Sequence, residues 1–184
     1  MSAPATEQHV ERPVERVVLL GADGSPVGTA DKATVHGADT PLHLAFSCYA
    51  TDGAGRLLLT RRAMAKRTWP GVWTNTVCGH PAPGEGSEEA VVRRARQELG
   101  LRLRDVVPVL PDFAYRATDA SGVVENEVCP VYTAVADADP DPDPDEVAEW
   151  RWVDWRDAVD VARRAPWALS PWSVLQLPLL DAAR

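Results

Sequence analysis

Short apolar runs bounded by turn-forming residues divide the chain into expected strands. The apolar segment 17–20 predicts a first strand, and the segment 22–25, which contains Asp and Gly, predicts the turn that follows it. A glycine-containing hairpin at 52–55 joins two further apolar segments. In all, we expect strands at 17–20, 42–50, 56–60, 73–79, 106–117, 123–135 and 149–153.

Helical periodicity is clearest between residues 87 and 99, where apolar residues recur on one side. We expect Ser87 to cap this helix at its amino end and Gly100 to end it. A short helix is expected at 157–164, and a longer one after Ser170, which precedes a proline in the first turn. These elements predict mixed α and β structure in which a sheet is flanked by helices.

Length and composition fit one globular domain. The chain has 184 residues, of which 45% are apolar and 25% are charged, enough to bury a real core. We expect residues 1–15 to form a flexible amino-terminal tail and residues 16–184 to form the domain. The run of Asp and Pro at 137–146 opposes regular structure, so we interpret it as an exposed acidic loop.

Charge and cysteine usage limit the partners and the compartment. The net charge of −8 argues against a nucleic-acid partner, although a local cluster of Lys and Arg can still hold a phosphate. No apolar run approaches the roughly 18 residues that span a bilayer, and the amino terminus lacks the apolar stretch of a secretion signal. Cys48, Cys78 and Cys129 are odd in number, which predicts free thiols in a cytoplasmic protein.

Two pairs of polar residues lie on expected strands, and in each pair the residues are two apart. Cys78 and His80 form one pair, and Glu125 and Glu127 form the other. Residues two apart point to the same face of a strand, so each pair can project into one pocket. Two carboxylates in an apolar strand are costly unless a cation neutralises them. The alternative is that both glutamates face solvent.

Three histidines lie in separate segments of the chain. His43 is surrounded by apolar residues, where a single histidine is more often a satisfied core residue than a ligand. Together with Glu125 and Glu127, however, His36, His43 and His80 would make a set of five nitrogen and oxygen ligands. Such a set suits an octahedral Mn, Mg, Fe or Zn ion with one open position. Spacing alone does not show that the five residues converge.

Basic residues near these segments are candidates for binding phosphate. A diphosphate requires several cationic donors and a metal ion, and for each single residue the alternative is ordinary solvated surface. The candidates are Lys32, Arg61, Arg62, Lys66, Arg67 and Arg94.

The stretch from Gly79 to Leu101 resembles the Nudix box, a loop–helix–loop that places glutamates on one helix face to hold Mg for diphosphate hydrolysis. Here Arg94 and Gln97 stand where that box has two of its glutamates, while Glu98 is kept. Arg94 and Glu98 are four residues apart and therefore share a helix face. The resemblance implies a cation for phosphate and one carboxylate for a metal, which is a poor arrangement for hydrolysis.

Longer motifs resemble one family of that superfamily, the metal-dependent type 1 isopentenyl-diphosphate isomerases. The matching segments are 42–46, 69–81, 115–119, 125–131 and 170–172, within a resemblance that spans about 16–178. The resemblance implies a single-domain α+β fold with a Nudix-like mixed sheet flanked by helices. It also implies an enzyme of isoprenoid biosynthesis that interconverts isopentenyl diphosphate and dimethylallyl diphosphate.

The same resemblance assigns roles to residues. It implies catalysis by Cys78 and Glu127, with Tyr115 hydrogen-bonded to the catalytic carboxylate. It implies one divalent metal (Mn, Mg or Zn) on the histidines and glutamates above, and a second ion, Mg, held by Glu98 and the carbonyl of Cys78 against the substrate diphosphate. The residues implied to bind the substrate are Lys32, Arg62, Lys66, Arg94 and Trp172.

Two other hypotheses belong to different classes. A Nudix hydrolase of some other diphosphate would release phosphate or a monophosphate, whereas a binding module without enzymatic activity would not depend on Cys78. The isomerase hypothesis predicts a small isoprenoid diphosphate as the partner, without nucleic acid or membrane, in a monomer or weak homodimer. The bland alternative for Trp172 is that it only fills the core.

Overall fold

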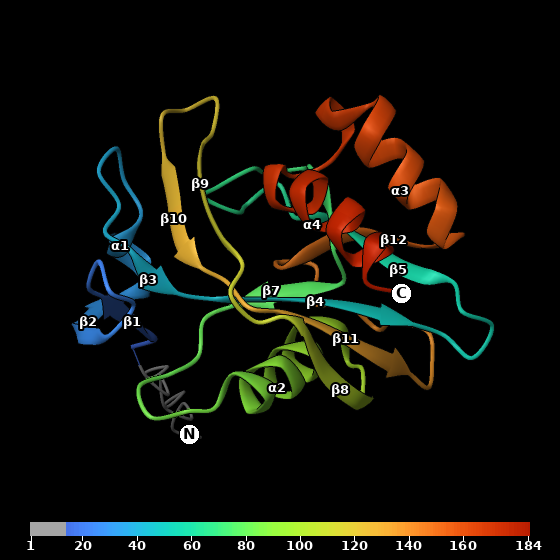
Figure 1. Ribbon diagram of the computed structural model, residues 1–184, viewed down its shortest axis with the longest axis horizontal. Helices are drawn as coiled ribbons and strands as arrows, with labels where there is room; N and C mark the ends of the chain where they lie inside the picture. Colours follow the sequence, from blue (N-terminus) through green and yellow to red (C-terminus); the bar gives the residue numbers. More distant parts are fainter. Residues whose placement is uncertain (1–13) are drawn as a thin grey trace, which may run out of the picture.

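The computed structural model describes residues 14–184, which form two β-sheets with helices packed around the larger one (Figure 1). The smaller sheet has the order β2 (Pro26–Asp31), β1 (Arg16–Leu20), β3 (His43–Leu44), β10 (Val124–Val128), β9 (Ala114–Thr118). The larger sheet has the order β12 (Val147–Val153), β5 (Leu57–Arg62), β4 (Phe46–Thr51), β11 (Val131–Ala136), β8 (Leu103–Leu110). Two short strands complete it, namely β6 (Trp73–Thr74) beside β5 and β7 (Val77–Gly79) beside β4. The predicted α+β class with a mixed sheet is confirmed, since β3 and β10 pair in parallel and most other strands pair antiparallel.

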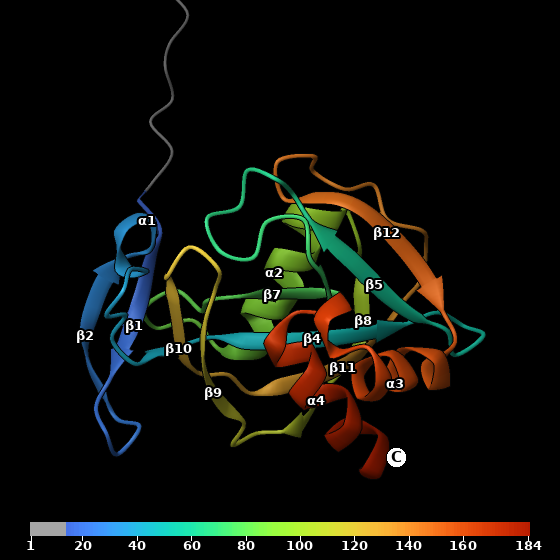
Figure 2. The ribbon, with the colours of Figure 1, turned by 90° about the horizontal axis from the view of Figure 1, so that it is seen from above.

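Helices cover both faces of the larger sheet. In Figure 1, α2 (Ser87–Leu99) lies on one face, while α3 (Trp155–Arg164) and α4 (Pro171–Ala182) lie on the other. Alternation along β4 explains the two cores: Phe46 packs with α2, whereas Tyr49 packs with α3 and α4. A single turn, α1 (Lys32–Val35), lies with the smaller sheet, which Figure 2 shows set apart from the larger one.

Three segments that we predicted as single strands are in fact broken, and the breaks carry the chain between the sheets. The predicted strand 42–50 is divided at Ala45 into β3 and β4, and 123–135 is divided at Cys129 and Pro130 into β10 and β11. Pro130 has no N–H to continue a ladder, although its carbonyl accepts a hydrogen bond from Ser47 N at 3.0 Å. The predicted 106–117 is likewise β8 and β9. The crossing at Ala45 and the crossing at Cys129 and Pro130 run side by side, because Ala45 N donates to Val128 O at 2.9 Å.

The ends of the elements match the sequence in part. Ser170 caps α4 by accepting from Ser173 N, and Gly100 ends α2 with a φ of 63°, as predicted. Ser87 does not cap α2: Gly86 occupies the cap position, and Ser87 is the first helical residue. The predicted strand 73–79 is interrupted at 75–76. Neither β2 nor α1 was predicted.

The acidic segment 137–146 is a loop without helix or strand, as predicted, but it is attached to the end of α2. Asp141 N donates to Leu99 O and Asp143 N donates to Glu98 O, both at 2.9 Å. A Cβ at Gly100 would lie 3.0 Å from the carbonyl oxygen of Asp141, so the loop also needs a glycine there. These contacts fix the position at which the loop delivers Glu146.

Of the tail predicted at 1–15, residues 1–13 lie outside the described residues. Glu15 is part of the ordered structure, since its carbonyl accepts from Lys32 N at 2.9 Å. Within residues 14–184, no helix has both the length and the apolar character needed to cross a bilayer.

Candidate active site

A cavity of about 560 Å³ lies where the two sheets meet. The smaller sheet and α1 supply one part of its wall, and β4, the end of β5 with the loop 66–68, β7, α2 and α4 supply other parts. All but three of the candidate residues from the sequence line it: His43 and Glu98 are buried behind the wall, and Arg61 lies outside the cavity. The lining includes Lys32, His36, Arg62, Lys66, Cys78, His80, Arg94, Tyr115, Glu125, Glu127 and Trp172.

Strand register brings the predicted metal ligands together. His43 on β3 and Glu127 on β10 are partners in the parallel pair, while His80 directly follows β7 and His36 directly follows α1. One ligand atom from each of these four residues lies within 4.8 Å of those of the other three. Glu125 joins them, with its Oε2 2.9 Å from Nε2 of His36. We call these five residues the histidine–glutamate cluster.

The cluster is buried and incompletely hydrogen-bonded. Glu125 and Glu127 are 7% and 6% exposed, which excludes the alternative that both face solvent. Nε2 of His36, Nδ1 of His80 and Oε2 of Glu125 are buried and form no hydrogen bond within residues 14–184, although the first and last of these atoms lie 2.9 Å apart. Unpaired buried polar atoms are rare in folded proteins and require a reason. Imidazole and carboxylate donors that converge in this way fit a divalent cation.

The orientation of His43 also fits a ligand. Its Nδ1–H donates to the carbonyl of Pro41 at 2.9 Å, and since a carbonyl only accepts, Nδ1 carries the proton. In the neutral ring Nε2 therefore carries the lone pair, 3.2 Å from Nε2 of His80 and 3.5 Å from Oε1 of Glu127, and in the protonated ring it donates to that carboxylate instead. A hydrogen bond on the far nitrogen is the usual way in which a protein fixes a histidine ligand.

Burial and proximity shift the pKa values within the cluster in different directions. Burial favours the protonated form of Glu127, but the hydrogen bonds and charges of His43 and His80 outweigh it and lower the pKa of this carboxyl. Burial also opposes the charged form of His43, yet Glu127 raises the pKa of His43 above its ordinary value. For His80 burial prevails and its pKa is lowered. The carboxylate of Glu127 is therefore ionised at neutral pH.

Cys78 lies on β7, next to the cluster in sequence and on the cavity wall. Burial raises its pKa to about 11; Arg62 and Lys66 lower it, while Glu98 and Glu127 raise it further. All three cysteines are free thiols, as predicted. Cys48 and Cys129 are buried, and only Cys78 contributes to the lining.

Aromatic residues form another part of the wall. Tyr115 on β9 is the cross-strand partner of Glu127, and its ring centroid is 5.8 Å from that of Trp172. Within residues 14–184, however, no hydrogen bond joins the Tyr115 hydroxyl to Glu127. Trp172 is 3% exposed, so it fills the core and lines the cavity at once, and its Nε1–H donates to Oδ1 of Asn75 at 2.9 Å. Asn75, which is fully buried, was missed by the sequence interpretation.

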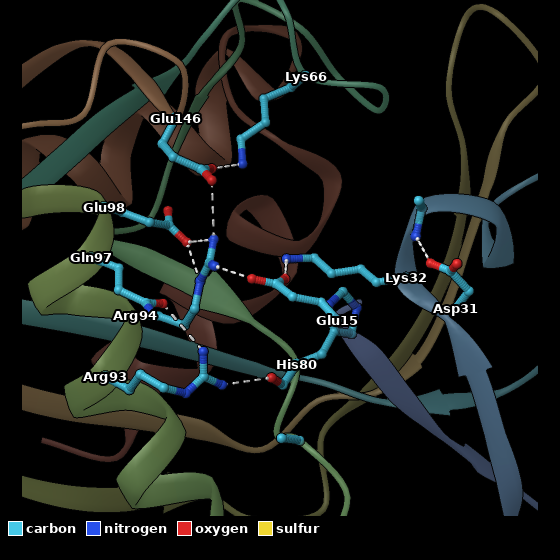
Figure 3. Close-up of polar contacts among 12 residues, drawn as sticks. Glu15, Asp31, Lys32, Lys66, His80, Arg93, Arg94, Gln97, Glu98 and Glu146 are labelled. Carbon is cyan, nitrogen blue, oxygen red and sulfur yellow. Dashed lines mark hydrogen bonds and ion pairs between the residues drawn. The ribbon is translucent and has the colours of Figure 1, made fainter. Parts of the chain in front are cut away.

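Three of the four predicted diphosphate-binding residues, Lys32, Lys66 and Arg94, contact carboxylates (Figure 3). Arg94 is only 5% exposed, and its guanidinium lies 2.5 Å from Glu98, 3.3 Å from Glu146 and 3.4 Å from Glu15. Lys66 also pairs with Glu146, and Lys32 pairs with Glu15 at 2.5 Å. We call these six residues the basic cluster. Glu15 and Glu146 were not predicted, because only the fold places them beside these cations.

Arg62 is held differently from the basic cluster. Its Nε donates to Thr68 O at 3.0 Å, and its guanidinium carbon lies 5.6 Å from the ring centroid of Trp172. Arg67 lines the cavity as well, whereas Arg61 does not and instead faces Glu149. The basic wall therefore adjoins the aromatic wall.

The chain is similar to known proteins both in sequence and in fold. The model of the NUDIX domain matches residues 41–176. A Leifsonia xyli subsp. xyli protein named isopentenyl-diphosphate Delta-isomerase is 60% identical over 173 residues, which cover 93% of this chain and 94% of that protein. A Frankia alni protein of the same name is 66% identical over 169 residues, 92% of this chain and 87% of that protein. A crystal structure of a Deinococcus radiodurans protein superposes with a TM-score of 0.68 at 20% identity, covering 89% of this chain and 98% of that one, a likeness of fold alone.

Proposed function

This chain belongs to the isopentenyl-diphosphate Delta-isomerase family of NUDIX-domain proteins, and we propose that it interconverts isopentenyl diphosphate and dimethylallyl diphosphate in isoprenoid biosynthesis. The observation that carries the proposal is one cavity lined by Cys78, by ligands of the histidine–glutamate cluster and by the cations of the basic cluster. Cys78 and the histidine–glutamate cluster suit proton transfer beside a metal, and the cations of the basic cluster suit binding of a diphosphate.

The reaction moves a double bond by one position. A proton adds to the terminal carbon of the alkene, which generates a tertiary carbocation, and a second proton leaves the neighbouring methylene carbon. Two groups are therefore required, one that gives a proton and one that takes it. Cys78 and Glu127 are our candidates, and the direction of the reaction decides which of them acts first.

The surroundings of Cys78 and Glu127 favour opposite protonation states for the two groups. Burial keeps the proton on the Cys78 thiol, whereas His43 and His80 keep Glu127 ionised. Acid and base roles are commonly assigned to groups whose pKa values the protein moves apart in this manner. We infer that Tyr115, the partner of Glu127 across the β9–β10 pair, assists this carboxyl when substrate is bound.

The histidine–glutamate cluster would hold one divalent ion, for which we propose Mn, Mg or Zn. Three imidazoles and two carboxylates fit such an ion, and three buried atoms of the cluster form no hydrogen bond in the part of the chain that the structure describes. When bound, the ion would supply positive charge that permits two carboxylates to share a buried site. We propose a second ion, Mg, bound with the diphosphate by Glu98 and the carbonyl of Cys78.

The aromatic wall would protect the carbocation from water. Trp172 and Tyr115 face the cavity, and Trp69 packs edge-on against Trp172 with ring centroids 5.4 Å apart. A cation over an aromatic ring is stabilised by up to about 2 kcal/mol where water is excluded. We propose that Trp172 covers the hydrocarbon part of the substrate while Lys32, Arg62, Lys66 and Arg94 bind its diphosphate.

A direct assay tests the proposal. Purified protein is incubated with isopentenyl diphosphate and Mg²⁺ in deuterated water, beside Cys78→Ala and Glu127→Gln, and the products are followed by NMR. We expect deuterium-labelled dimethylallyl diphosphate from the wild type, and its loss in both variants. Release of phosphate or a monophosphate would instead indicate a Nudix hydrolase, and binding without any turnover would indicate a binding module.

We further propose that the enzyme is cytoplasmic and acts as a monomer or weak homodimer on a small molecule, without a nucleic-acid or membrane partner. The net charge of −8 supports the exclusion of nucleic acid. Light scattering after size exclusion, at protein concentrations that differ tenfold, tests the oligomeric state. A stable higher oligomer at both concentrations would contradict it.

A further inference from the structure

One carboxylate bridges two parts of the proposed diphosphate site. Oε2 of Glu15 lies 2.5 Å from Nζ of Lys32, and its Oε1 lies 3.4 Å from Nη1 of Arg94 (Figure 3). Lys32 begins α1 beside the smaller sheet, whereas Arg94 belongs to α2 against the larger sheet. A phosphate group would offer the same two cations the same kind of oxygen pair.

The carboxylate of Glu15 is ionised at neutral pH. Partial burial raises the pKa of Glu15, but the hydrogen bond and charge of Lys32, together with the charge of Arg94, lower it by more. Glu15 and the side chain of Val14 also line the cavity, so the carboxylate occupies space that the substrate needs.

A second carboxylate of the basic cluster provides a contrast. Glu146 also contacts Arg94, and its main chain is held on both sides, with its carbonyl accepting from Ala63 N at 3.0 Å and its N–H donating to Asp143 O at 3.0 Å. Its side chain is 26% exposed, whereas that of Glu15 is 52% exposed. Within residues 14–184 each of the two carboxylates contacts two cations, but that of Glu15 is the more exposed, so a change of side-chain rotamer is enough to move it into solvent.

We infer that Glu15 is an internal anion that competes with the substrate diphosphate for Lys32 and Arg94. The inference rests on the proposed function, because it requires that these cations bind a diphosphate. Substrate and product both carry that group, so the competition lowers the affinity for each and favours release of the product. Exposed ion pairs contribute little, so we expect an effect of about two- to fivefold rather than orders of magnitude.

The test measures the binding of inorganic pyrophosphate with Mg²⁺ by titration calorimetry. Wild type is compared with Glu15→Gln, which keeps the size of the side chain and removes its charge. The matched control is Asp137→Asn, because Asp137 pairs with Arg104 at 2.8 Å, is 58% exposed and lies outside the cavity. Both variants lose one negative charge, so a general change in net charge affects them equally.

We expect Glu15→Gln to bind pyrophosphate about two- to fivefold more tightly and to lower the KM for isopentenyl diphosphate by a similar factor, with Asp137→Asn unchanged. Unchanged or weaker binding by Glu15→Gln, while wild type binds, would overturn the inference and leave the proposed function standing. If the wild type does not bind pyrophosphate, the diphosphate site itself fails and the inference fails with it. An equal gain in both variants would assign the effect to net charge and would also overturn it.

Discussion

The histidine–glutamate cluster and the basic cluster adjoin the same cavity, yet they satisfy their polar groups in opposite ways. Within the first, three buried atoms form no hydrogen bond to any residue that the structure describes, whereas in the second every cation already contacts a carboxylate. The first is therefore shaped to receive a cation with little rearrangement. The second must exchange partners before an anion can bind.

The difference follows from how the backbone supports each group. Strand register fixes His43 opposite Glu127. The basic cluster instead draws on an exposed chain segment, a helix and the end of the acidic loop, and its long side chains reach one another across these. A strand cannot shift its register by one residue without turning all of its side chains to the other face of the sheet. A long side chain, in contrast, can change rotamer without any movement of the backbone.

The largest expected effect lies in the histidine–glutamate cluster. Glu127→Gln should lower kcat by about 10²- to 10⁴-fold, because the amide can neither accept nor return the proton. The measurement is the rate of deuterium incorporation by NMR, with circular dichroism as the check on folding. Glu149→Gln, outside the cavity, is the matched control. A folded Glu127→Gln with wild-type kcat would remove this residue from the chemistry.

The next effect lies in the basic cluster. Arg94→Lys should raise KM by about tenfold, since the ammonium cannot reproduce the fork of the guanidinium, which now contacts three carboxylates. The kcat should change far less than the KM. Steady-state kinetics over a range of substrate concentrations decide this, and a loss of kcat at constant KM would show that Arg94 acts in the proton transfer instead.

Added salt should affect the basic cluster more than the histidine–glutamate cluster, with a smaller effect than either substitution. Raising the ionic strength to 1 M shortens the screening length to about 3 Å, which weakens exposed charges far more than buried ones. We expect the KM to rise by about two- to threefold with added KCl while kcat stays constant. A fall in kcat with unchanged KM would mean that salt reaches the buried cluster.

The smallest expected effect concerns the ion pair of Arg93 and Glu85, which lies beside the backbone of His80. Arg93 donates to Glu85 at 2.6 and 2.7 Å and to the carbonyl of His80 at 3.2 Å. The Arg93 hydrogen bond is the main cause that lowers the pKa of Glu85, so its stabilisation is present above the ordinary value of 4.5 and is lost as the pH falls through the lower, folded value.

Glu85→Gln should therefore lower the free energy of unfolding by about 0.5–1 kcal/mol at pH 7. Urea unfolding of both proteins at neutral and at acid pH measures it. The difference between them should shrink as the pH falls below 4.5. A difference that grows towards acid pH would contradict the assignment of the shift to Arg93.

What the sequence could predict depended on how local the signal was. Helix α2 was found because its periodicity and the terminal Gly100 are local features. The breaks at Ala45 and Pro130 were missed, since an apolar run keeps its alternation whether or not the chain changes sheets. The pairs Cys78/His80 and Glu125/Glu127 were found from strand geometry, and all four residues line the cavity.

Residues whose roles depend on distant partners could not be found in this way. The family resemblance supplied the ligand set, because spacing alone does not say which histidines meet. Glu15 and Glu146 carried no signal, because a glutamate near the amino end and the last acid of an acidic loop are ordinary in sequence, and Asn75 lay in a matching segment without any sign of its partner. Each acquires its partner only in the folded chain, as in the contact of Asn75 with Trp172.

The paired crossings at Ala45 and Pro130 have a consequence for the order of folding. They join segments more than 80 residues apart in the chain, and His43 meets Glu127 only once both have formed. Contacts of such long range close slowly, after local hairpins and helices. Helices and hairpins are therefore expected to form before the long-range ladder that brings His43 to Glu127, so a partly folded chain does not yet present the assembled ligand set to metal ions in solution.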